Sequence, residues 1–218
     1  MTLLRKTKTL LSTLCRDISG LAVIEFAYVM PIFTAVGIGG IEMTNYANTN
    51  MKISQAAMAL ADNMSRVGLE SSLSSVQIRE ADVNDGLIGF QRQTGNLNFG
   101  LNGRVILSSL ERNAEGGQWI HWQRCFGSMA VAPRYGTQDT GITGTAFLGM
   151  GPSTGRVTAP IDTAVMFVEV TYTYQPLFTG FFLRDRTIRH EASFINRDPR
   201  DLAQIYNPNP AATVATCT

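Results

Sequence analysis

The sequence has few cysteines, few histidines and little net charge, and each shortage excludes a class of protein. Its three cysteines, at positions 15, 125 and 217, are too few and too scattered for a disulfide framework or a zinc site. Its two histidines, His121 and His190, have no neighbouring ligand at metal-site spacing. The formal net charge of +1 gives no reason to expect a nucleic-acid partner. We therefore expect no metal site and no binding of nucleic acid.

Motifs that carry enzyme chemistry are also missing. The chain has no G-x-S-x-G, H-E-x-x-H, Walker or dinucleotide-binding glycine pattern. His121 lies between Trp119 and Trp122, a setting that favours packing or a partner surface over catalysis. Paired carboxylates could be imagined among Asp139, Asp162 and Glu169, but nothing in the sequence brings any two of them together. We expect no catalytic residue, no enzyme activity and no cofactor.

One long apolar segment accounts for the thin charge of the chain, in which 16% of residues are charged and 44% are hydrophobic. Between residues 21 and 43 only Glu25 and Glu42 are charged. As a helix these residues rise roughly 34 Å, which is enough for the hydrocarbon core of a bilayer. The segment predicts a transmembrane helix.

Basic residues lie mainly before this segment, and they predict its orientation. Four precede it against a single acid, Asp17, whereas only Lys52 and Arg66 follow before residue 70. The four are Arg5, Lys6, Lys8 and Arg16. The positive-inside rule therefore places the N-terminus in the cytoplasm and exports the rest of the chain. A conventional signal peptide fits less well, because the first small-x-small site, at residues 57–59, lies well beyond the apolar stretch.

Glu25 is the anomaly in the apolar segment, since a carboxylate in a spanning helix is unfavourable unless it is paired. A simple interpretation is that it reaches the headgroups near the cytoplasmic end or is protonated. However, Gly20 precedes four apolar residues, then Glu25 and the aromatic Phe26. This window resembles the processing site of type IV pilins, especially those of the tight-adherence (Flp/Tad) branch. The segment 20–42 is similar to the N-terminus of TadE-like pseudopilins, with looser support from residues 168–178 and 188–197.

The resemblance implies a minor pilin or pseudopilin that takes part in assembly of a tight-adherence type IV pilus. A prepilin peptidase would cut between Gly20 and Leu21, removing a basic leader, residues 1–20. Glu25 would then pair with the free amine of Leu21 on a neighbouring helix and set the register of the bundle. The implied partners are the membrane, the prepilin peptidase, other pilins or pseudopilins and inner-membrane pilus assembly proteins. A permanently anchored, single-pass periplasmic enzyme or ligand-binding domain is the alternative.

Several residues further along the helix bear on its packing. Pro31 removes one backbone hydrogen bond and predicts a kink or local unwinding. Small residues that permit close approach of helices in lipid follow it: Gly37, Gly39 and Gly40. Glu42, at the outer end, is most simply a solvated residue, with a contact role as the alternative.

The exported part, residues 44–218, predicts an α+β domain. Apolar spacing continues the membrane helix over residues 44–68 and suggests a second helix between 76 and 95, with serines 71–75 as candidate caps and Gly95 as its stop. We expect four strands, at residues 103–112, 118–126, 163–174 and 187–196. Residues 127–160 have no clear period and predict an irregular region. The expected fold is an antiparallel sheet of about four strands packed on the long helix.

The implied cleavage also affects the cysteines. If Cys15 leaves with the leader, Cys125 and Cys217 remain in an oxidising compartment, where disulfides persist. A bridge between them is expected, and it would stabilise the fold by about 4–5 kcal/mol in the chain-entropy model. Two free thiols or one intermolecular bridge are the competing interpretations.

Overall fold

The structure is a computed structural model that describes residues 20–68, 75–178, 183 and 186–217. The chain divides into two compact units, the first ending at Thr44 and the second beginning at Asn45. This division lies one residue beyond the expected one. The leader, apart from Gly20, lies outside the described residues, as do Cys15 and the candidate caps 71–74.

The first described element, α2 (Leu21–Arg66), is a helix of 46 residues that belongs to both units. Leu, Ala, Met and Ile dominate its sequence, and Pro31 lies inside it with helix on both sides. The helix ends two residues before Gly68, close to the expected stop. A Cβ at Gly68 would lie 2.1 Å from the Cγ1 of Val76, so the backbone approach there requires glycine. The predicted continuation of the apolar helix into the second unit is confirmed.

The second unit contains a four-stranded antiparallel sheet in the order β2-β1-β3-β4. Its strands are β1 (Gly103–Arg112), β2 (Gln118–Phe126), β3 (Val165–Thr173) and β4 (Thr187–Ile195). The bounds agree with the prediction within two residues at every end. Alternating side chains made the strands recognisable, because such residues cover the two faces of a sheet separately. The expected α+β class is confirmed.

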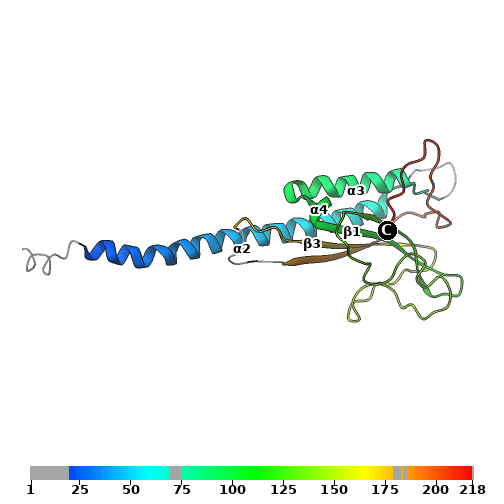
Figure 1. The fold of residues 1–218 in the computed structure, drawn as a ribbon. Coiled ribbons are helices and arrows are strands. Elements are labelled where there is room, and N and C mark those ends of the chain that lie inside the picture. The colour runs from blue at the N-terminus through cyan, green and yellow to red at the C-terminus, as the bar shows by residue number, and fades with distance from the viewer. Residues whose placement is uncertain (1–19, 69–74, 179–182, 184–185, 218) are drawn as a thin grey trace, which may run out of the picture. The chain divides into compact units, whose positions relative to one another are not determined.

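One face of the sheet packs against helices through the larger hydrophobic core. The strand residues Val168 and Tyr172 meet Leu60 of α2 and Leu87 of α3 (Glu80–Thr94) in this core. Figure 1 shows α3 running beside the end of α2. A Cβ on Gly86 of α3 would lie 2.5 Å from the Sδ of Met64, which shows how closely the two helices approach. A 3-10 turn η1 (Gly95–Leu97) and the short α4 (Phe99–Asn102) connect α3 to β1.

The second helix begins later than predicted. Residues 76 and 79 form isolated parallel bridges with Arg200 and Tyr206 instead of helical turns. Arg79 is the N-cap of α3, and its backbone N–H donates to the Oδ2 of Asp82 at 3.0 Å. The proposed capping by serines is therefore wrong, because pairing with the distant C-terminal segment displaces the first turn. Gly95 ends the helix as expected.

The other face of the sheet carries a second, smaller core. Val165 and Phe167 of β3 pack there with Ile120 and Leu110, and Tyr135 and Phe147 add cover from the irregular region. Residues 127–160 contain no helix or named strand, as predicted, although Met150 and Val157 form an isolated bridge. Glu169 follows Phe167 by two positions on β3, so it lies on this same face.

Candidate functional site

The apolar half of α2 is exposed on all sides. Every residue from 21 to 37 is exposed, including Phe26, which is 62% exposed. The helix has a window of mean hydropathy 2.0 and is, by length and composition, able to cross a membrane. Apolar side chains around the whole circumference would be unfavourable in water but suit a lipid environment. The structure thus supports a candidate membrane-spanning helix.

Gly20 and Glu25 lie at the start of this helix. Gly20 is exposed in a turn, and its carbonyl accepts the backbone N–H of Ile24 at 3.1 Å. The helix begins at Leu21, directly after the expected cleavage site. Glu25 is exposed one turn later, and its carboxylate makes no hydrogen bond or ion pair with a described residue. Its carboxylate is therefore accessible to a neighbouring molecule.

The small residues and Glu42 differ in their surroundings. Gly37 and Gly40 have no atom within 4 Å of an added Cβ, which leaves room for a neighbouring helix, and Gly39 is half-buried. Glu42 is fully buried and takes part in an interaction, so its prediction as a solvated end residue is wrong. Glu42 is also not an end residue, because α2 continues to Arg66.

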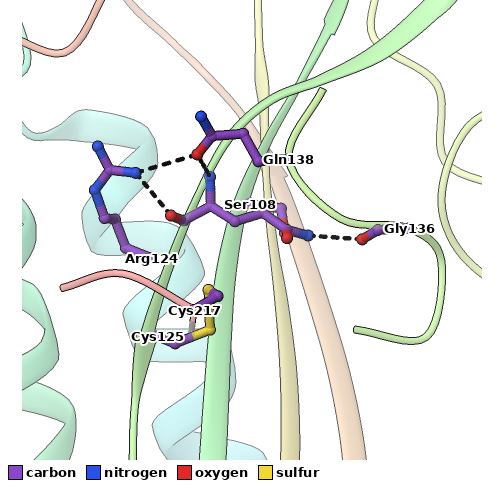
Figure 2. Close-up of a disulfide and its surroundings, with 7 residues drawn as sticks. Ser108, Arg124, Cys125, Gly136, Gln138 and Cys217 are labelled. Atoms are coloured by element: carbon purple, nitrogen blue, oxygen red, sulfur yellow. Dashed lines mark hydrogen bonds between the residues drawn. A yellow bond between two sulfur atoms is a disulfide. The ribbon is translucent and has the colours of Figure 1, made fainter. Parts of the chain in front are cut away.

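A disulfide joins Cys125 of β2 to Cys217, the pair expected from the sequence (Figure 2). Their Cα atoms are 4.9 Å apart, and 92 positions separate them in the chain. The backbone N–H of Cys125 donates to the carbonyl of Ala215 at 2.8 Å, so the tail lies along the outer edge of β2. The tail is irregular, but the disulfide and this pairing hold it in place.

A buried ion pair lies next to the disulfide and connects α3 to the sheet. Two guanidinium nitrogens of Arg124 in β2 donate to the carboxylate of Glu80 in α3. The distance between Nε of Arg124 and Oε2 of Glu80 is 2.9 Å. Figure 2 shows the Arg124 side chain also directed toward Gln138 of the irregular region. The Glu80 residue is only 3% exposed. The pair therefore links the N-terminus of α3 to β2 in a site with little solvent.

His121 is half-buried and packs against a neighbouring ring, one of the two roles that its sequence setting favoured over catalysis. Its ring stacks on Trp119 at a centroid distance of 4.1 Å, and its Nδ1 lies 2.9 Å from the Oε2 of Glu111. Ser109 donates its hydroxyl to the other Glu111 oxygen at 2.6 Å. The serine therefore contacts the carboxylate rather than the imidazole, which is not the arrangement of an activated nucleophile.

Two carboxylates that sequence reasoning did not pair face each other across β3 and β4. Glu169 lies directly opposite Glu191 in the register. The Oε2 of Glu169 accepts the backbone N–H of Arg134 at 2.9 Å, and the Oε1 of Glu191 accepts the hydroxyl of Tyr135 at 2.7 Å. Burial raises the pKa of Glu169 to about 7; the Arg134 N–H opposes this shift and the charge of Glu191 adds to it. Burial and the bond to Glu191 raise the pKa of Tyr135 to about 12.

Glu169 and Glu191 line a cleft of about 390 Å³ with residues of β1 and of the irregular region. Among the described residues, those of this cleft included, no three His, Cys, Asp or Glu side chains gather in a way that could hold a metal ion. Asp139 and Asp162 do not line this cleft; both have a positive φ, in loops. The structure thus places Glu169, one of the three carboxylates considered from the sequence, opposite Glu191, which was not considered.

Comparison of the chain with protein-family models, with curated proteins and with solved structures finds no match.

Proposed function

We propose that this chain is a minor pilin or pseudopilin that takes part in assembly of a tight-adherence type IV pilus. The observation that carries the proposal is a helix that begins directly after an exposed glycine, is exposed on every side over residues 21–37 and bears an accessible carboxylate at its fifth position. In a monomer this apolar surface stays exposed and contributes nothing to stability. A bundle of similar helices, in lipid or in a fibre, buries it.

Processing by a prepilin peptidase between Gly20 and Leu21 is the first step of this function. The backbone at Gly20 is exposed, and an added Cβ would meet no atom within 4 Å. The glycine is therefore not required for packing in this chain. A glycine at this position is better explained by a protease that must approach the backbone closely.

Assembly through Glu25 is the second step. After cleavage, the carboxylate of Glu25 and the new α-amine of Leu21 belong to the same first turns of the helix. In a bundle, the Glu25 of one chain pairs with the Leu21 amine of the next, which neutralises two charges that are unfavourable in an apolar environment. Such a pair sets the axial offset between neighbours more than it adds stability.

The location of the protein follows from the same proposal. The leader stays in the cytoplasm, α2 crosses the bacterial inner membrane once, and the second unit lies in the periplasm or, after assembly, at the cell surface. The disulfide between Cys125 and Cys217 suits this oxidising side of the membrane. The partners are the peptidase, other pilins or pseudopilins and the inner-membrane assembly proteins.

Cleavage tests the proposal directly. We expect N-terminal sequencing of membrane-extracted protein to begin at Leu21, and a Gly20→Leu variant to keep its leader. Gly37→Leu is the matched control, because a Cβ there also meets no atom within 4 Å. It should be cut like the natural chain. An intact leader on the natural chain would favour the alternative, a permanently anchored periplasmic domain.

A further inference from the structure

The cleft beside Glu169 has a charge arrangement that the assembly role does not explain. It lies on the face of the sheet that carries the second core, between β3, β4 and the irregular region around Arg134. Its volume of about 390 Å³ falls within the range of small-molecule sites. Both acidic and basic side chains line it.

The acidic end of the cleft holds two carboxylates and only one guanidinium, that of Arg134. Glu169 is only 8% exposed, and its Oε1 is buried with no hydrogen-bond partner among the described residues. The opposite carboxylate, Glu191, is engaged by the hydroxyl of Tyr135 and lies 3.5 Å from the Nη1 of Arg134. An unmatched carboxylate oxygen in such a site is costly, and a second carboxylate across the strand increases the cost. A cation with N–H donors would offset both.

The basic end of the cleft is open to an anion. Arg189 precedes Glu191 by two positions on β4, so the two side chains share a face at about 7 Å spacing. Arg189 is exposed and lines the cleft, and its guanidinium makes no hydrogen bond or ion pair with a described residue. Thr171 lies directly opposite Arg189 on β3 and also lines the cleft. A guanidinium and a hydroxyl are suited to a carboxylate ligand.

We propose that this cleft binds a small amino-carboxylate compound, with its ammonium group at Glu169 and Glu191 and its carboxylate at Arg189. These two charged ends fit a free amino acid or a short peptide whose amino and carboxyl termini are both free. A divalent cation fits poorly, because only two carboxylates are present and two guanidiniums share the cleft. This inference does not depend on the assembly role.

Isothermal titration calorimetry on the full chain in neutral detergent tests the proposal. The probes are L-alanine, the dipeptide Ala-Ala, alanine methyl ester, which keeps only the ammonium, and N-acetylalanine, which keeps only the carboxylate. We expect the zwitterionic probes to bind, and the tighter of the two identifies the source as amino acid or peptide. Loss of either charge should weaken binding about tenfold or more, the effect of one charge-assisted hydrogen bond.

Variants assign each end of the cleft. Glu169→Gln should abolish the preference for a free ammonium, and Arg189→Gln should abolish the preference for a free carboxylate while leaving binding of the ester unchanged. Glu115→Gln and Arg92→Gln, both at exposed positions away from the cleft, should bind like the natural chain. Because Arg189 is exposed, its variant folds even if Glu169→Gln does not. Absence of binding by every zwitterionic probe at millimolar concentration, binding of calcium in its place, or unchanged affinity in Arg189→Gln would overturn the proposal.

Discussion

At the scale of single residues, Glu169 shows how a strand position becomes a site. Its neighbours Val168 and Val170 lie in the larger core, so the alternation of β3 turns Glu169 to the other face. There it is covered by the segment that donates the Arg134 N–H. The one hydrogen bond does not compensate the burial of a full charge, which is why the pKa of the carboxyl is raised to about 7.

The raised pKa of Glu169 predicts a specific dependence of stability on pH. The pKa is about 7 in the folded chain against an ordinary 4.5, so the neutral carboxyl stabilises the fold below pH 4.5 and this contribution is lost as pH rises through 7. We expect the free energy of unfolding to contain a term that falls by about 3 kcal/mol over that range. Denaturant unfolding of the full chain in detergent, at a series of pH values, measures it.

Glu169→Gln isolates this term, because the amide has nearly the same shape and does not titrate. The difference in unfolding free energy between the natural chain and this variant should change across the pH range. The exposed Glu115→Gln variant should follow the natural chain. Parallel curves for Glu169→Gln and the natural chain would show that the carboxyl is not held neutral.

At the scale of elements, the link between α3 and the sheet depends on charge as well as apolar packing. Leu87 and Val83 place α3 on the larger core, and the Glu80–Arg124 pair fixes its first residue to β2. A buried ion pair contributes little net stability, but losing one partner leaves the other charged and unsolvated. The position of the helix end therefore depends on both partners being present.

Arg124→Ala should accordingly be strongly destabilising. It leaves the buried Glu80 carboxylate without its guanidinium, and we expect the unfolding free energy to fall by about 3–5 kcal/mol. Replacing both residues with methionine should restore most of this loss. Arg66→Ala is the control, since its i,i+4 pair with Asp62 is exposed and should contribute under about 1 kcal/mol. Chemical unfolding followed by circular dichroism gives all four values, and equal losses for Arg124→Ala and Arg66→Ala would contradict the prediction.

The elements also show what the sequence could and could not predict. The strands were recognisable because period-two alternation is local to each strand. The start of α3 was not, because Val76 and Arg79 pair with residues more than 120 positions away. The pairing of Glu169 with Glu191 could have been predicted. Aligning the midpoints of the two predicted strands as a hairpin places these residues opposite each other, as the structure does. What could not be predicted is the burial of Glu169, which depends on where residues 127–160 fold.

At the scale of the whole molecule, α2 joins two different environments in one element. Its first part is exposed around the full circumference, whereas its second part has one face in the larger core. The sheet, the two cores and the disulfide of the second unit are formed by residues from Asn45 onward. The exposed segment can then vary or pair with other chains without affecting the fold of the domain.

This separation makes the role of Glu25 testable. A Glu25→Ala variant should insert, be cut after Gly20 and fold its second unit normally, because Glu25 contacts no described residue. In the proposed bundle, however, the α-amine of each neighbouring Leu21 would lose its carboxylate, and the offset between chains would no longer be fixed. We expect co-purification with other pilins and incorporation into fibres to fall sharply, and Glu25→Asp, which keeps the charge, to restore part of both. Glu115→Ala is the matched loss of an exposed carboxylate outside the helix and should assemble normally. Normal assembly of a correctly cut Glu25→Ala chain would leave the carboxylate without the pairing role, even if the protein is a pilin.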